Sequence, residues 1–219
     1  MSLSKLGIME AKRKHVIITG TGRAGTTFLI ELLTNLGLDT GFKPGEIELD
    51  EIARAGLELD IRDENAPYIV KNPWFMDYAK EVFARKDIEI EHIFIPVREI
   101  HAAAKSRSLV DKQARSQMDI LRRFFKKSST IKGAYWHAKN QKEQERVLLD
   151  KMFNFLLNVS DTYIPVTFLR FPRIVNEAEY LFKKLSPILS GISYTEFSTV
   201  FNEIANPGLV HNFNKNNSK

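Results

Sequence analysis

The sequence predicts an α/β fold in which a central parallel sheet of about four to five strands carries helices on both faces. Short apolar or β-branched runs alternate along the chain with longer segments whose apolar residues recur at helical spacing. A glycine-rich turn joins the first such run directly to the first such helix, as happens at the carboxyl end of a parallel strand. Strands that alternate with helices favour a sheet covered on both sides.

The first strand and the helix after it are the clearest elements. The strand is expected at Val16–Thr19, where every residue is apolar or β-branched. The helix is expected over Gly25–Asn35, because its apolar residues recur at helical spacing and Gly37 follows as a natural C-cap. Further strands are expected at Tyr68–Lys71, His92–Val97 and Val166–Leu169. Further helices are expected over Phe75–Arg85, from Arg98 to about Leu109, over 110–159 with a break near Ser128–Gly133, and over Val175–Leu185.

The ends of these strands are expected to bring three cations together. Carboxyl ends of parallel strands meet at one edge of a sheet, and ligands of such folds bind beyond that edge. Arg23 lies in the turn after the first strand, Lys71 ends the second, and Arg98 follows the third. These side chains should therefore converge on one edge of the sheet.

Length and composition limit the class of protein. A chain of 219 residues with 43% hydrophobic residues corresponds to one domain, or to one domain with a lid. It has no apolar run long enough to span a membrane, and Met1–Lys14 lacks the apolar core of a secretory signal. The absence of cysteine excludes disulfides and thiol catalysis and fits a cytoplasmic protein. His and acidic residues show no close ligand spacing, so no metal is expected.

The domain boundaries follow from the same elements. An N-terminal extension is expected at 1–14, a single domain at 15–211 and a polar, disordered tail at 212–219. The helical segment at about 107–159 is basic and is expected to be lid-like. The sequence leaves the oligomeric state open.

Positive charge is concentrated in one part of the chain. The net charge is +5, and Lys105–Arg146 holds twelve Lys or Arg against four Asp or Glu. This segment is interpreted as a solvated helical face, as part of a site for an anionic ligand or acidic substrate, or as a surface for nucleic acid. No helix-turn-helix, RNP or zinc-finger pattern supports nucleic acid as a partner.

The turn Gly20–Thr27 has the chemistry of a phosphate-binding loop. Its glycines let the backbone approach an anion without a Cβ in the way. The N–H groups and the dipole at the start of the next helix favour an anion at the same place. Arg23, Thr26 and Thr27 add a cation and two hydroxyl groups.

One substitution separates this turn from the loop of nucleotide triphosphatases, which reads G-x-x-x-x-G-K-[ST]. Gly20 and Gly25 have the required separation, but Thr26 stands in the lysine position and the cation is Arg23, inside the loop. The lysine that reaches the β- and γ-phosphates is therefore missing, which weakens an interpretation as a kinase or ATPase.

The pattern G-x-[RK]-x-G-T-T resembles the 5′-phosphosulfate loop of the PAPS-dependent sulfotransferases, whose fold is of the P-loop type. A second stretch is similar to the family's 3′-phosphate site, because Arg98 follows a strand and Ser106 lies eight residues further on. Ile100 replaces a proline that is frequent there, and the family's late R-K-G-x-x-G motif is absent. Lys71, in Lys-Asn-Pro, resembles the lysine of the family's K-[SD]-P pattern.

The resemblance implies roles for these residues. PAPS would be the sulfuryl donor and PAP the product, with no metal ion. Arg98 and Ser106 would bind the 3′-phosphate, while Lys71 and Arg23 would stabilise charge on the group in transfer. The residues implied to bind the 5′-phosphosulfate are Gly22, Arg23, Ala24, Gly25, Thr26 and Thr27.

A general base must take the proton of the acceptor. The Gly45-Glu46 pair resembles the tyrosylprotein type of sulfotransferase, so Glu46 is the first candidate. Glu48 and Asp50 are close rivals, and His101 is a weaker one because it lies within the helix after Arg98.

The resulting hypothesis is a sulfotransferase that acts on a small-molecule, carbohydrate, lipid or peptide acceptor. A P-loop small-molecule or nucleoside kinase and a non-catalytic nucleotide-binding module of the same fold are the alternatives. Tyr135 and Trp136 have two interpretations, either as packing residues or as aromatic groups of a lid that stacks on adenine.

Overall fold

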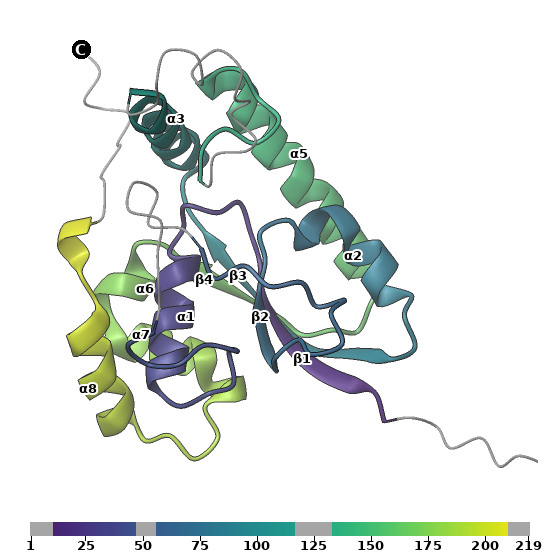
Figure 1. The fold of residues 1–219 in the computed structure, drawn as a ribbon, viewed down its shortest axis with the longest axis vertical. Coiled ribbons are helices and arrows are strands. Elements are labelled where there is room, and N and C mark those ends of the chain that lie inside the picture. Colours follow the sequence, from purple (N-terminus) through teal and green to yellow (C-terminus); the bar gives the residue numbers. More distant parts are fainter. Residues whose placement is uncertain (1–10, 47–55, 117–132, 210–219) are drawn as a thin grey trace, which may run out of the picture.

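A parallel sheet of four strands lies at the centre of the computed structural model of the protein, whose described residues are 11–46, 56–116 and 133–209 (Figure 1). The strands are β1 (Arg13–Ile18), β2 (Ile69–Lys71), β3 (Ile88–Val97) and β4 (Val166–Arg170). Their order across the sheet is β2-β1-β3-β4, and every neighbouring pair is parallel. The predicted α/β fold with a central parallel sheet is confirmed.

Helices cover both faces of this sheet, as Figure 1 shows. One face carries α1 (Thr26–Asn35), α6 (Arg173–Asn176), α7 (Ala178–Leu185) and α8 (Tyr194–Ile204). The other face carries α2 (Phe75–Phe83), α3 (Ile100–Ser116) and α5 (Gln141–Ser160). Two 3-10 turns, η2 (Ser186–Ile188) and η3 (Pro207–Leu209), follow α7 and α8. The arrangement is compatible with a three-layer α/β/α architecture, and none of the helices described is long and apolar enough to cross a membrane.

The alternation of side chains along β1 divides the core into two clusters. Val16 and Ile18 pack with the leucines of α1, whereas Ile17 packs with Phe75 of α2 and Phe155 of α5. Successive residues of a strand point to opposite faces, so an unbroken apolar run is what a strand covered on both sides requires. All three residues of this run are fully buried.

Two strands begin earlier than the sequence predicted. β1 begins at Arg13 instead of Val16, and β3 begins at Ile88 instead of His92. The added residues pair with each other, and Lys14 makes an ion pair of 2.6 Å with Glu91. Charged residues with a partner in the neighbouring strand do not form the apolar run on which the prediction relied. Residues 1–10 of the expected extension and the expected tail at 212–219 lie outside the described residues.

The C-terminal part holds more helix than expected. In place of one helix over Val175–Leu185 the chain forms α6 and α7, and α8 follows without having been predicted. The side chain of Ser193 caps α8 by accepting a hydrogen bond of 3.2 Å from the N–H of Glu196. The Ser-x-x-Glu spacing of a capping box was the available signal.

The helix over 110–159 was expected with a break near Ser128–Gly133, and the non-helical stretch continues past Gly133 to residue 140. α3 continues to Ser116, residues 117–132 lie outside the described residues, and 133–140 form turns before α5. Gly133 and His137 have φ angles of 74° and 52°, which a helix does not permit. Asn140 then caps α5 by accepting a hydrogen bond from the N–H of Glu143.

Candidate anion-binding site

The glycine-rich turn after β1 has an unusual backbone. Gly22, Arg23 and Gly25 have φ angles of 66°, 57° and 84°. Arg23 is the informative member, because a side chain makes the left-handed region costly and residues held there often belong to functional sites. The turn starts from a fixed point, since Thr19 donates from its N–H to Phe94 O of β3 and from Oγ1 to Asn72 O beyond β2.

Gly25 ends the turn and is the N-cap of α1. It has no side chain, and no side chain caps this helix. A Cβ at Gly25 would lie 2.9 Å from Ile174 Cδ1 and 3.2 Å from Phe171 Cδ2, so the residues after β4 pack directly against the turn. Thr26 is buried and Thr27 is half-buried in the first turn of the helix. The start of α1 therefore combines the helix dipole with an N-cap residue that supplies no side-chain oxygen.

Arg23 joins the turn to α3. Its Nε donates a hydrogen bond of 3.1 Å to Ser106 Oγ, and Ser106 is buried. The sequence placed Ser106 beside Arg98, whereas the structure places its hydroxyl on Arg23. Both interpretations put Ser106 at the same edge of the sheet.

Arg98 completes this group. Its Nη1 donates to the backbone carbonyl of Arg23 at 2.9 Å, and its guanidinium lies over the ring of Phe171 with 4.8 Å to the centroid. Burial lowers the pKa of Arg98 to about 10, and the neighbouring charge of Arg23 acts in the same direction. Arg98 is still protonated at neutral pH, so two guanidinium groups lie close together beside the turn.

Arg107 is a third cation in this region, and it was not predicted. Its Nη2 donates to Thr21 O at 2.6 Å and its Nη1 to Ala134 O at 2.7 Å. Only 6% of the residue is exposed, and burial together with the charge of Arg23 lowers its pKa to about 9. The available signal was helical spacing, because Arg107 shares the buried stripe of α3 with Ala103, Val110 and Ala114.

Lys71 reaches the predicted edge but is enclosed. It pairs with Ile18 in the β1–β2 register, so β2 ends beside β1 as expected. Its side chain is 1% exposed, and its Nζ lies 2.5 Å from Glu58 Oε1 and donates to the carbonyl of Gly56. For Lys71 to reach a ligand beside the turn, the contact with Glu58 would have to open.

The candidate bases have different surroundings. Glu46 is exposed in a turn where its N–H bonds to Lys43 O at 3.2 Å. His101 forms hydrogen bonds with Glu145 and Gln141, which link α3 to α5. Glu48 and Asp50 lie outside the described residues. The role of Glu46 as the base stays a prediction.

The two aromatic residues considered for a lid are core residues. Trp136 is 5% exposed and Tyr135 is 9% exposed. The Trp136 ring has Lys151 Nζ at 4.2 Å and the Arg107 guanidinium at 5.6 Å from its centroid. The packing interpretation is therefore the one that the structure supports.

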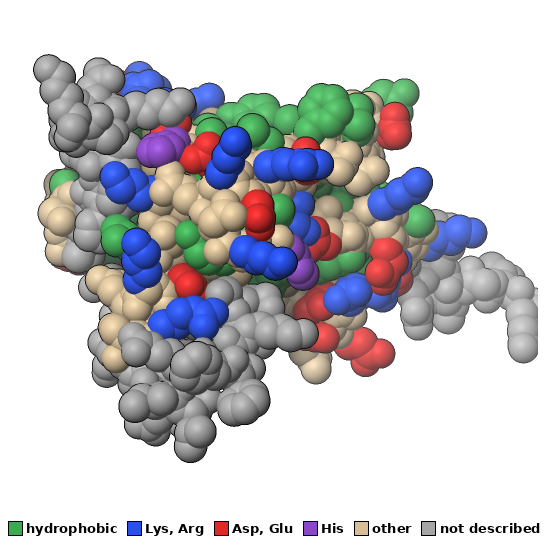
Figure 2. All heavy atoms as spheres, turned by 90° about the horizontal axis from the view of Figure 1, so that it is seen from above, with side chains coloured by type: hydrophobic (Ala, Val, Ile, Leu, Met, Phe, Trp, Pro, Cys, Tyr) green, Lys and Arg blue, Asp and Glu red, His purple; other side chains and the backbone are tan. Residues whose placement is uncertain are grey.

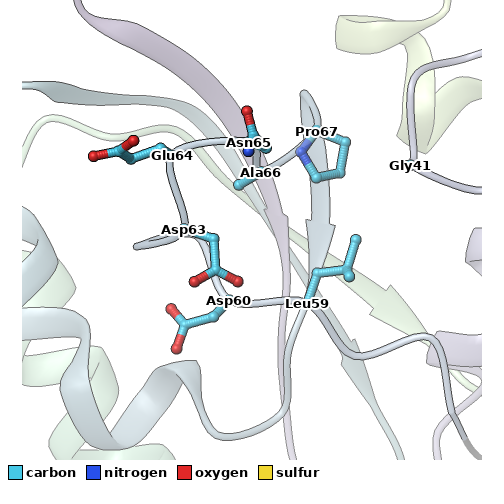
Figure 3. Close-up of a pocket in the computed structure, with 8 residues that line it drawn as sticks. All are labelled: Gly41, Leu59, Asp60, Asp63, Glu64, Asn65, Ala66 and Pro67. Atoms are coloured by element: carbon cyan, nitrogen blue, oxygen red, sulfur yellow. The ribbon is translucent and has the colours of Figure 1, made fainter.

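An acidic hollow of about 510 Å³ lies elsewhere, beside Gly41 and the segment Leu59–Pro67 (Figure 3). Figure 3 shows the carboxylates of Asp60 and Asp63 pointing toward the same space. Arg13, at the start of β1, donates a hydrogen bond to Asp63 O at this hollow. Its charge does not suit an anion, and the described residues hold no group of three or more His, Asp or Glu that could bind a metal.

Charge over the surface is mixed. Figure 2 shows lysine and arginine side chains spread over one face with aspartate and glutamate among them. The cations that gather beside the turn are identified by their contacts with it and with Ser106. Much of the basic segment Lys105–Arg146 lies outside the described residues.

No protein-family model matches this chain, and neither a curated protein nor a solved structure matches it. A function has to be argued from the residues of the candidate site.

Proposed function

We propose that the protein is a sulfotransferase of P-loop type that moves the sulfuryl group from PAPS to a hydroxyl or amine acceptor. The observation that carries the proposal is the hydrogen-bonded group of Arg23, Arg98 and Ser106. These residues come from the turn after β1, the end of β3 and the middle of α3. Cationic and hydroxyl donors beside an uncapped helix start suit a ligand with phosphate groups at two positions.

The proposed transfer is direct and in line. The bond between sulfur and the bridging oxygen of the donor breaks while the acceptor oxygen or nitrogen bonds to sulfur, and PAP is the leaving group. Glu46 takes the acceptor proton, and Arg23 and Lys71 stabilise the charge that develops on the bridging oxygen. The residues proposed to hold the 5′-phosphosulfate are Gly22, Arg23, Ala24, Gly25, Thr26 and Thr27, and Arg98 with Ser106 is proposed for the 3′-phosphate.

A thermal-shift titration with PAP, AMP, ADP and ATP, each with and without Mg²⁺, tests the donor. A ligand that binds only the folded state raises the melting temperature. Stabilisation by PAP that exceeds that by AMP and ADP and does not need Mg²⁺ is expected, because the site reads the 3′-phosphate. Stabilisation by ATP only with Mg²⁺, and none by PAP, would replace the proposal with a kinase.

One observation favours a second candidate, a nucleotide-binding module without transferase activity. Lys71 is buried against Glu58 and Gly56, and a catalytic lysine needs access to the reacting group. PAP binding without turnover over a panel of phenol, sugar, lipid and peptide acceptors with PAPS would support this candidate. Sulfated product from any of them would exclude it.

A further inference from the structure

We propose that Arg107 is a positioning residue of the anion site, which fixes the glycine-rich turn and places a positive charge beside it. The inference rests on the proposed function only in requiring that a phosphate-bearing ligand binds at this turn. Arg107 would act through the backbone of Thr21 and Gly22, and not by direct contact with the reacting atoms.

The contacts of Arg107 tie the turn to the body of the protein. One end of its guanidinium donates to Thr21 O, and the other donates to Ala134 O. Thr21 immediately precedes the run of left-handed residues that begins at Gly22. A planar guanidinium with two separate donors can hold two carbonyl groups at a fixed distance, which a single ammonium group does not do.

Gly22 has no side chain, which leaves room for the Arg107 guanidinium. A Cβ at Gly22 would lie 2.7 Å from Arg107 Nη2, closer than any normal contact. The backbone of the turn therefore lies directly on the arginine, and the glycine is needed for that approach as well as for its φ of 66°.

The charge of Arg107 lacks a counter-ion within the described parts of the chain. The one acid a helical turn away, Asp111, pairs instead with Arg115 at 2.9 Å. Arg107 Nε is buried without a hydrogen-bond partner, although the Trp136 ring lies beside the guanidinium. A buried cation without an acidic partner is costly, and a bound anion beside the turn would offset that cost.

Isothermal titration of the folded protein with inorganic pyrophosphate and with PAP tests the inference. Arg107→Met removes the charge at similar volume and should weaken the binding of both anions by about tenfold or more. Arg107→Lys keeps the charge but loses one of the two carbonyl contacts. Its affinity for each anion should therefore lie between that of the wild type and that of Arg107→Met. Arg62→Met is the control, because Arg62 also bonds to a neighbouring side chain and lies over a tyrosine ring, and the residues on either side of it accept hydrogen bonds from Arg13 at the start of β1.

A double-mutant cycle separates positioning from general stability. Gly22→Ala should weaken anion binding in the wild type, and by clearly less in the Arg107→Met background, because the clash with Nη2 is gone. A residue that only stabilises the fold would lower the melting temperature without this coupling in affinity.

The outcomes are distinct. Wild-type affinity in Arg107→Met, or additive effects in the cycle, would overturn the inference while leaving the sulfotransferase proposal intact. If the wild type binds pyrophosphate and has no higher affinity for PAP, the sulfotransferase proposal is removed. The inference about Arg107 is then tested by the pyrophosphate affinities of its variants. Binding of neither anion by the wild type would end both. If Arg107→Met does not fold, wild-type affinity in Arg107→Lys is the result that overturns the inference.

Discussion

Arg98 donates a hydrogen bond of 2.9 Å from Nη1 to the backbone carbonyl of Arg23, so the cation that follows β3 holds the turn that follows β1. The two residues are 75 positions apart in the chain and adjacent only because β1 and β3 are neighbours in the sheet. Arg98 thus has a structural role through its hydrogen bond to Arg23 O, and in the proposed function it also binds the 3′-phosphate.

Ser106→Ala should weaken PAP binding by about three- to tenfold, because it removes a hydroxyl that the proposal assigns to the 3′-phosphate and that Arg23 contacts. The affinity for AMP, which lacks that phosphate, should change much less. Titration calorimetry with both ligands measures the difference. Ser108→Ala is the control, because Ser108 is also buried on α3, whereas the hydrogen bond from Arg23 Nε goes to Ser106. Equal losses for PAP and AMP would argue against a 3′-phosphate site.

Gly25→Ala should lower the free energy of unfolding by about 2–4 kcal/mol, since it combines left-handed strain with a clash. The new methyl group would meet Ile174 and Phe171. Gly37→Ala isolates the strain, because Gly37 has a φ of 79° with no atom near its Cβ position, and it should cost about 1 kcal/mol. Urea denaturation measures both, and equal effects would contradict the packing described for Gly25.

Glu58→Leu should lower the free energy of unfolding by about 3 kcal/mol, because it leaves the buried ammonium of Lys71 without its carboxylate. Adding Lys71→Met should restore much of the loss, since the buried ammonium group is then removed as well. Glu179→Leu, which removes an exposed pair with Lys183, should barely move the urea midpoint. A double variant as unstable as Glu58→Leu alone would contradict this account.

Stability should fall as the pH drops below about 6.5, the ordinary pKa of histidine. Burial lowers the pKa of His15 and of His92 in the folded protein. A depressed folded pKa means that the unfolded chain binds more protons in this window, so acid favours unfolding. His15 donates from Nδ1 to Pro67 O, which leaves a buried Nε2 without a partner.

Melting temperatures from about pH 7.5 to about pH 5.5 test this expectation. His15→Gln should flatten the slope. His137→Asn should leave it unchanged, because His137 is exposed and asparagine tolerates its left-handed backbone. A slope that is the same in all three proteins would exclude His15 as a source.

Glu46→Gln should lower the turnover of sulfated product by about a hundredfold, while PAP affinity stays near that of the wild type. The amide keeps the shape of the side chain but cannot take a proton from the acceptor. Glu64→Gln, an exposed residue at the acidic hollow, is the control. Unchanged turnover in Glu46→Gln would remove Glu46 from the role of base and leave Glu48, Asp50 and His101.

Much of the fold could be predicted because buried parallel strands carry an unmistakable pattern. Val16, Ile17 and Ile18 had to be covered on both faces, and the helix after them shows its apolar stripe directly. The first halves of β1 and β3 could not be predicted in the same way, because Lys14 and Glu91 are stabilised by one another across strands. α8 was missed although Ser193 and Glu196 form the start of a capping box.

The residues that gather at the site were largely predicted, but not their contacts. Arg23, Arg98 and Ser106 were named from strand ends and spacing, and the structure brings them together. The structure shows that Ser106 contacts Arg23 and that Glu58 encloses Lys71. Both contacts depend on how separate segments fold against each other. Arg107 was overlooked because its two acceptors, Thr21 O and Ala134 O, come from segments far from it in the chain.

The sequence alone indicated the strand–turn–helix unit, because the apolar run at Val16–Ile18, the glycines after it and the apolar spacing up to Asn35 are local patterns. The tertiary structure alone decided which cations share one place and what each one touches. Arg23, Arg98 and Arg107 are drawn together by the order of strands in the sheet and by the packing of α3 beside the turn. Such contacts join residues far apart in the chain, and no local pattern specifies the distance between them.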